Sequence, residues 1–272
     1  MTEQLRDRIA LFLSHRRKLV ALVGAGISAD SGVPTFRDDD GIWTIGSVNY
    51  VPQEMGTAKM LRANPIEVWK WKLNYNNFFK KAEPNAGHFA LKELEDMLGD
   101  RFQLVTQNID GLHFEAGSSR ERTLQIHGSI EHTRCLKGCT EELFGLPNVS
   151  YTKGEAWTEA HTKALACPKC GGFLRPHVLL FDENYDDFNW ESSLKAAQEC
   201  GMLLMVGTTL ATNLPQAVFM EAMSRNALCI NVNPSKRIDL KHKEKNVHWL
   251  EGSATTVLPE LVNIMRELTP VS

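Results

Sequence analysis

Four apolar runs with β character recur along this chain, and each one stops at a loop of small or polar residues. The runs are residues 19–23, 102–105, 202–206 and 227–230. Helical patterns separate or follow them, at residues 87–98, 190–199, 215–225 and 257–268. Strands that alternate with helices predict an α/β fold with a parallel sheet covered on both faces. Ligands of such sheets bind where the strands end, so the four loops define one candidate site.

The first loop, residues 24–29, reads GAGISA and satisfies the dinucleotide-binding pattern G-x-G-x-x-G/A between a strand and an expected helix. Such a turn suits a phosphate-bearing cofactor, although a tight turn without a ligand is the alternative. A dehydrogenase would continue into a second strand with an acidic residue about 20 residues on, to hold the ribose. This chain continues instead into Pro34, Phe36, Arg37 and three aspartates, which disfavours a dehydrogenase.

Amide and carboxylate side chains follow the second apolar run, in the sequence TQNIDGLH at residues 106–113. Amides both donate and accept hydrogen bonds, so this loop suits a carboxamide or a sugar. A helix N-cap formed by Asn108 or Asp110 is the alternative. His127 follows soon after, and a neutral imidazole can take a proton from a hydroxyl group near pH 7. From these residues alone, a catalytic and a structural role are both open for His127.

Four of the six cysteines stand in two close pairs with C-x3-C and C-x2-C spacing, namely Cys135, Cys139, Cys167 and Cys170. In a reducing cytosol such pairs indicate metal binding and not disulfides. Four thiolates complete a tetrahedral zinc site, which is closed and structural. Acidic residues and no basic patch flank the pairs, so nucleic-acid binding is disfavoured.

Two segments do not fit the alternation of strands and helices. Residues 44–83 are rich in Trp, Asn, Lys and Met and look helical, and residues 131–175 carry the paired cysteines. Both are expected to be insertions into the sheet domain. The net charge of −3 gives no case for nucleic acid or a membrane surface. The first 18 residues indicate an amphipathic helix and not a signal peptide, so the expected location is the cytoplasm.

Taken together, the ordered motifs resemble the sirtuins, the NAD-dependent protein-lysine deacylases. The motifs are GAGISADSGVPTFR, TQNIDGLH, HGS, the two cysteine pairs, RPHVLLFDE, GTTL and NVN. The resemblance implies a Rossmann-like NAD-binding domain formed by residues 1–43, 84–130 and 176–272. It also implies a smaller lobe made of a helical module, residues 44–83, and a zinc-binding module, residues 131–175.

The resemblance implies roles for the motif residues. His127 would be the general base, Asn108 would face the nicotinamide ribose, and Phe36 would shield the reacting ribose carbon from water. Structural Zn²⁺ would be held by the four paired cysteines. The residues implied in NAD binding are Gly24, Ala25, Gly26, Phe36, Arg37, Trp43, Gln107, Asn108, Ile109, Asp110, Gly207, Thr208, Thr209, Asn231, Asn233 and Ala254.

An acyl-lysine protein or peptide would bind as an added strand against Val178, Leu179 and Phe181. The branch of the family that removes succinyl and malonyl groups has a Tyr-x-x-Arg pair in the helical module. This chain has Lys72 and Tyr75 there and lacks the arginine, so a strong preference for acidic acyl groups is not expected.

Two other places depart from the family. The cofactor loop carries Asp38-Asp39-Asp40, and Asp182 stands where the family usually has glycine, which predicts a less free backbone there.

The leading hypothesis is therefore an NAD-dependent protein-lysine deacylase, most simply a deacetylase, that yields nicotinamide, O-acyl-ADP-ribose and free lysine. A second hypothesis keeps NAD but changes the acceptor, as in a mono-ADP-ribosyltransferase or an NAD hydrolase. A third, of another class, is a zinc-bearing sensor of NAD or ADP-ribose without turnover. A dehydrogenase comes last because the ribose-binding carboxylate is absent.

Overall fold

A six-stranded parallel sheet forms the centre of the computed structural model, which describes residues 1–35, 52–235 and 246–269. The strand order is β3-β2-β1-β7-β8-β9, and each adjacent pair is parallel. The strands are β1 (Lys18–Val23), β2 (Phe102–Thr106), β3 (Thr123–Gln125), β7 (Cys200–Val206), β8 (Leu228–Asn233) and β9 (Val247–Glu251). The four predicted strands are the four central ones, and the parallel α/β fold is confirmed.

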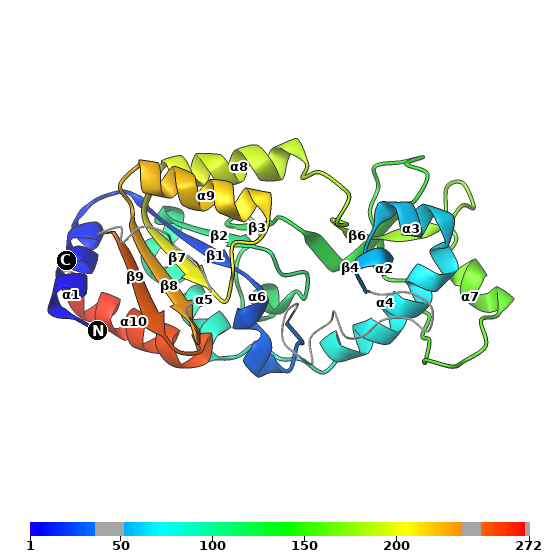
Figure 1. Ribbon diagram of the computed structural model, residues 1–272, viewed down its shortest axis with the longest axis horizontal. Helices are drawn as coiled ribbons and strands as arrows, with labels where there is room; N and C mark the ends of the chain where they lie inside the picture. Colours follow the sequence, from blue (N-terminus) through cyan, green and yellow to red (C-terminus); the bar gives the residue numbers. More distant parts are fainter. Residues whose placement is uncertain (36–51, 236–245, 270–272) are drawn as a thin grey trace.

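Helices cover both faces of this sheet, as its apolar runs require. On one face α1 (Glu3–Ser14), α5 (Ala86–Leu98) and α10 (Ala254–Leu268) pack against Leu19, Ala21 and Val23. On the other face α8 (Asp187–Gln198) and α9 (Asn213–Ser224) pack against Val20 and Leu22. Figure 1 shows α8 and α9 above the strands and α10 below them. Successive residues of a strand point to opposite faces, so a strand covered on both sides is apolar throughout.

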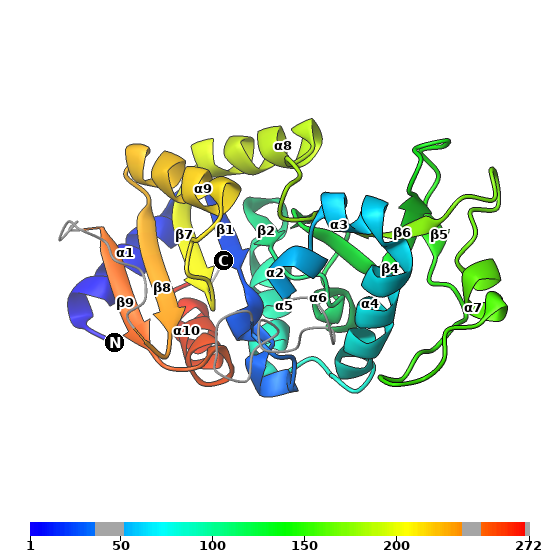
Figure 2. The same cartoon turned by 45° about the vertical axis from the view of Figure 1, so that its right-hand side comes forward.

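A second, smaller group of elements lies at the other end of the long axis in Figure 1. It contains the antiparallel sheet β5-β4-β6. Its strands are β4 (Gly128–Cys135), β5 (Phe144–Gly145) and β6 (Leu174–Val178), and its helices are α2 (Pro52–Met55), α3 (Ala58–Ala63), α4 (Pro65–Phe79) and α7 (Glu159–Ala164). Figure 2 shows α3 and α4 beside β4 and β6.

Helix α4 and the cysteine-bearing segment share one apolar core. Trp69 and Leu73 of α4 pack with Cys135, Cys167 and other buried residues of the segment around the second sheet. The indole nitrogen of Trp69 donates to the Leu174 carbonyl oxygen over 2.8 Å. The two insertions expected from the sequence are therefore packed against each other in the described residues.

The predicted helix after Asn85 is confirmed, with the asparagine as its N-cap. The Asn85 side chain accepts from the Gly87 N–H at 2.9 Å, and the His88 ring accepts from the Asn85 N–H at 3.2 Å. The helix expected after the glycine turn is wrong. Residues 25–31 form two short 3₁₀ turns, η1 (Ala25–Ile27) and η2 (Ala29–Ser31), and Gly32 ends them with a left-handed φ of +81°. Within the described ranges, no helix combines the length and the apolar character needed to cross a membrane.

Gly128 is a backbone position where a larger residue would force neighbouring backbone to shift. Its φ is +79°, and a Cβ added there would lie 2.2 Å from the His177 carbonyl oxygen across the β4–β6 pair. Gly32 has a similar φ of +81°, but an added Cβ would meet nothing within 4 Å. The two glycines thus differ in free space and not in backbone conformation.

We expect Gly128→Ala to lower the free energy of unfolding by about 3 kcal/mol, because left-handed backbone strain adds to the steric overlap. The matched variant Gly32→Ala, which has only the strain, should lose about 1 kcal/mol. Urea unfolding of both variants measures the difference. Equal losses would show that the strands β4 and β6 can separate to admit a methyl group.

Candidate active site

The loops that follow β1 and β7 lie backbone against backbone at the carboxyl edge of the sheet. The Gly26 N–H donates to the Gly207 carbonyl oxygen over 2.9 Å. A Cβ on Gly26 would lie 2.6 Å from the Gly207 Cα, so no side chain fits between the loops. Gly207 itself has a φ of +58° and donates to the Val232 carbonyl oxygen at the end of β8. The two loop backbones therefore approach as closely as glycine permits. Ala25, next to Gly26, is half-buried.

Polar side chains connect the ends of β2, β7 and β8 at this edge. The Gln107 amide donates to the Thr208 hydroxyl over 2.8 Å. The Asn233 amide donates to the Thr208 carbonyl oxygen at 3.2 Å and to the Asn231 side-chain oxygen at 2.6 Å. Thr209 follows in the same loop. Residues from three distant parts of the sequence thus meet at one place, as expected for the carboxyl ends of parallel strands.

A buried polar cluster lies beneath the glycine turn. The Ser28 hydroxyl donates to one Asp110 carboxylate oxygen over 2.7 Å and accepts from the Asn108 amide at 3.1 Å. The His88 ring nitrogen Nε2 lies 3.3 Å from the same hydroxyl. Burial raises the pKa of Asp110 against these hydrogen bonds, and it lowers the pKa of His88 to about 4. The cluster fixes the loop of β2 against the turn of β1.

The N-cap role considered for Asp110 is wrong, because the N-cap of α6 (Leu112–Glu115) is Gly111 and Asp110 precedes it, but Asp110 still contacts the start of the helix. Its second carboxylate oxygen accepts from the Leu112 N–H at 3.1 Å. Ile109 contacts the strand that contains Ile130, β4, because its carbonyl oxygen accepts from the Ile130 N–H at 3.0 Å. Ser28 and His88 were missed as site residues. Ser28 stood inside the glycine motif, whereas His88 had no sequence signal beyond its place in a predicted helix.

His127 lies between β3 and β4, with hydrogen-bond partners on both ring nitrogens. Nδ1 is 2.9 Å from the Gln107 carbonyl oxygen and Nε2 is 3.0 Å from the Tyr185 hydroxyl oxygen. A carbonyl only accepts, so the partners assign the hydrogen to Nδ1 and the lone pair to Nε2. Burial lowers the pKa of His127 to about 4, which keeps the ring neutral at pH 7. A neutral imidazole with an outward lone pair can serve as a general base.

The residues expected to meet a substrate peptide adjoin His127. Val178 is paired with Gly128 across β4 and β6, and the Leu179 N–H donates to the His127 carbonyl oxygen over 2.9 Å. Phe181 is 57 % exposed, and its N–H donates to the Gly56 carbonyl oxygen. These residues form one continuous segment that leads away from the candidate base.

Asp182, which departs from the usual glycine, anchors this segment to α3. Its two carboxylate oxygens accept from the Ala58 N–H at 2.5 Å and from the Lys59 N–H at 3.0 Å, at the start of that helix. These bonds hold the pKa of Asp182 below its ordinary value, although burial opposes them. A carboxylate is favourable at a helix N-terminus because the first N–H groups lack partners within the helix.

The remaining predicted site residues are either buried on helices or lie outside the described residues. Lys72 is buried on α4, and burial lowers its pKa to about 7. Ala254 is buried in the first turn of α10, next to Gly87. The side chain of Tyr75 lies outside the described residues, as do Phe36, Arg37, Trp43 and the aspartates at 38–40.

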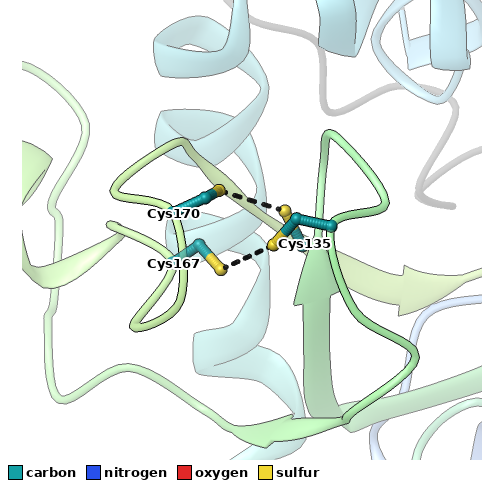
Figure 3. A group of neighbouring side chains, drawn as sticks. Cys135, Cys167 and Cys170 are labelled. Atoms are coloured by element: carbon teal, nitrogen blue, oxygen red, sulfur yellow. Dashed lines mark hydrogen bonds between the residues drawn. The ribbon is translucent and has the colours of Figure 1, made fainter.

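The four paired cysteines come together as the spacing predicted. The four sulfur atoms lie within 4.8 Å of one another. Cys135 and Cys170 are 3.6 Å apart (Figure 3). Cys139 and Cys167 are 3.7 Å apart. A tetrahedral zinc site with Zn–S bonds of about 2.3 Å separates its sulfurs by about 3.8 Å, so the cluster fits zinc. Because four thiolates fill the coordination shell, the metal would be structural.

We expect one zinc ion per chain, and its loss in Cys170→Ala with a Tm lower by at least about 5 °C. The control is Cys200→Ala, which removes a buried thiol outside the cluster and should keep the metal. Elemental analysis and thermal unfolding measure the two effects. A wild-type protein that binds no zinc after loading would contradict the assignment.

The sequence matches a known protein family and its members. The sequence model described as the Sir2 family matches residues 24–213. An NAD-dependent protein deacylase of Leptospira interrogans (serovar Lai, strain 56601) is 38 % identical over 251 residues, which cover 90 % of this chain and 92 % of that protein. One from Pyrococcus abyssi is 35 % identical over 267 residues, covering 96 % and 98 %.

Solved structures agree over nearly the whole chain. A Sir2 homologue in complex with NAD superposes with a TM-score of 0.78 at 28 % identity, covering 99 % of this chain and 96 % of that one. A mutant Sir2 homologue in complex with 2′-O-acetyl ADP-ribose superposes with a TM-score of 0.80 at 30 % identity, covering 100 % and 99 %. From sequence and structure alike, this chain belongs to the Sir2 family, the sirtuins.

Proposed function

We propose that this chain is an NAD-dependent protein-lysine deacylase that acts on acetyl-lysine. The observation that carries the proposal is the state of His127, neutral and with its Nε2 lone pair directed away from the Gln107 carbonyl. Relatives at 35–38 % identity are named NAD-dependent protein deacylases, which supports the same activity here.

NAD would be held by the loops at the carboxyl edge of the sheet. The glycine turn at residues 24–26 and the loop at residues 207–209 would face its phosphates, because their backbones approach each other without side chains between them. Asn231 and Asn233 at the end of β8 would meet the adenosine ribose. When bound, NAD supplies an ADP-ribose group that accepts the acyl group as nicotinamide leaves.

His127 would take a proton from a ribose hydroxyl group through Nε2. The Gln107 carbonyl oxygen accepts from Nδ1–H and so holds the ring orientation, and it stabilises the imidazolium that proton transfer creates. The Asn108 amide group is fixed by Ser28, which leaves its side-chain oxygen to accept a hydrogen bond in the site. Asp110 would accept from the carboxamide of nicotinamide.

The acyl group is proposed to be acetyl. A terminal carboxylate on the acyl chain needs a fixed positive partner, and Lys72 is a poor one because burial lowers its pKa to about 7. The substrate peptide would lie along Val178, Leu179 and Phe181 as an added strand, where backbone pairing gives affinity with little sequence demand. Zinc would hold the small lobe together through the core it shares with Trp69.

The division into domains is part of the same proposal. Residues 1–43, 84–130 and 176–272 would form the NAD-binding domain, with residues 44–83 and 131–175 as the helical and zinc-binding modules. Separate apolar clusters on the large sheet and around α4 support this division. Location in the cytoplasm is also a proposal, supported by four thiols placed for metal binding in place of disulfides.

We expect His127→Ala to lower kcat for an acetyl-lysine peptide by about 10²- to 10⁴-fold, the usual contribution of a positioned general base. Mass spectrometry of the deacetylated peptide and of nicotinamide measures the loss. The control His15→Ala changes an exposed histidine at the end of α1 and should keep full activity. Turnover retained in His127→Ala would exclude the role of His127.

The lowered pKa of His127 predicts an unusual pH profile. A base with the ordinary histidine pKa of about 6.5 would lose about tenfold in kcat/KM between pH 7.5 and 5.5. Because burial lowers the pKa of His127 to about 4, it stays deprotonated over this range, and kcat/KM should change by less than about twofold. Zinc content and circular dichroism at each pH control for unfolding. An acid limb centred near pH 6.5 would contradict the burial effect.

A further inference from the structure

The nitrogen of His127 that would accept a proton has a protein partner in this structure, the hydroxyl group of Tyr185. The two atoms lie 3.0 Å apart and the ring centres 5.7 Å apart. Tyr185 lies in the loop between β6 and α8, beyond the motif RPHVLLFDE that ends at Glu183. Neither the sequence motifs nor the proposed reaction uses this residue.

The direction of the hydrogen bond follows from the other side of the imidazole ring. Because Nδ1 donates to the Gln107 carbonyl oxygen, Nε2 of the neutral ring has only a lone pair to offer. Burial raises the pKa of Tyr185, so the phenol keeps its hydrogen at neutral pH. Tyr185 therefore donates, and it donates to the lone pair that catalysis needs.

The backbone around Tyr185 is held on both sides. Two residues before it, the Glu183 carboxylate pairs with both terminal nitrogens of Arg175 at 2.5 and 2.9 Å. One residue after it, Asp186 caps α8 by accepting from the Asn189 N–H at 2.8 Å. Because the backbone is held on both sides, moving the hydroxyl group away from His127 would require rotation of the Tyr185 side chain and not movement of the loop.

Polar groups at the N-terminus of α9 also lie near the Tyr185 hydroxyl group. The Thr212 side chain and the Leu214 N–H lie close enough to Tyr185 to lower its pKa against the effect of burial. The ring also contacts Trp190 of α8, with ring centres 6.1 Å apart. The Tyr185 hydroxyl group thus has polar groups other than His127 close by, and its ring is packed against α8.

We propose that Tyr185 is a positioning residue whose hydroxyl group occupies the Nε2 lone pair of His127 and is exchanged for the substrate hydroxyl group that gives up its proton. A single lone pair accepts one such bond, so the two hydroxyl groups compete for it. The inference rests on the proposed role of His127 as the base. Its test therefore includes a readout that does not need turnover.

Diethyl pyrocarbonate supplies that readout, because it acylates the unprotonated nitrogen of a histidine. We expect His127 to react about three- to tenfold faster in Tyr185→Phe than in the wild type, since removal of an ordinary hydrogen bond frees Nε2 by about this factor. Peptide-level mass spectrometry follows His127, with exposed His15 as the internal standard. Tyr151→Phe, which removes a hydroxyl group in the zinc-binding lobe, should leave the rate unchanged.

An equal rate in the wild type and in Tyr185→Phe would overturn the proposal. Tyr185→Leu is the second variant and should show the same acceleration if the first one does not fold.

Steady-state kinetics then show whether the Tyr185 hydroxyl group competes with the substrate hydroxyl group for Nε2 or assists the reaction. If the hydroxyl groups compete, kcat/KM for NAD with an acetyl-lysine peptide should rise in Tyr185→Phe by the same three- to tenfold. An unchanged or lower kcat/KM, with His127 more reactive toward the reagent, would overturn the exchange. If the wild type itself shows no turnover, the proposed function fails, and the reagent rates alone still decide whether Tyr185 covers the Nε2 nitrogen.

Discussion

The backbone contact between Gly26 and Gly207 is the constraint on which the site depends. It joins the ends of β1 and β7 without a side chain between them, and the two neighbouring loops, from β2 and β8, then attach through Gln107 and Asn233. A methyl group on either glycine would overlap backbone atoms of the other loop, which cannot move aside as a flexible side chain can. The carboxyl edge of the sheet is therefore formed by closely packed backbone with polar side chains around it, which suits a phosphate-bearing ligand.

The candidate base lies where the two parts of the chain meet. His127 ends the connection from β3 of the large sheet, and Gly128 begins β4 of the small one. The return strand β6 comes back beside His127 through Leu179, and the loop after it is fixed by Asp182 on α3 and by Glu183 on Arg175. The same short region thus orients the base, presents the edge expected to take a peptide, and carries Tyr185 onto the base nitrogen.

Much of this arrangement could be predicted from the sequence because its causes are local. Strands buried on both faces are continuous apolar runs in the sequence, so the four central strands were predicted. Cysteines at metal-ligand spacing indicate a cluster, so the four thiols were predicted as well. Strands β3 and β9 were missed because most of their residues are only partly buried and they lack that pattern. In place of the helix expected after the glycine turn, residues 25–31 form two 3₁₀ turns, and Ser28 within them contacts Asp110 and Asn108, residues about 80 positions away.

The same reason applies to the remaining misses. Asp182 was recognised as a departure from the family, but its helix-capping role depends on α3, more than 120 residues away. Tyr185 has no motif at all, and its role appears only when the loop after β6 is placed against His127. Sequence patterns report burial and local spacing, whereas these residues act through partners that only the fold brings near.

The central claim is that the acyl group of a lysine is transferred to ADP-ribose. The measurement that tests it most directly is mass spectrometry of all products from NAD and an acetyl-lysine peptide. Deacylation predicts free lysine peptide, nicotinamide and O-acetyl-ADP-ribose in equal amounts. Nicotinamide with only ADP-ribose, or an ADP-ribosylated protein with the acetyl group still on lysine, would contradict the account.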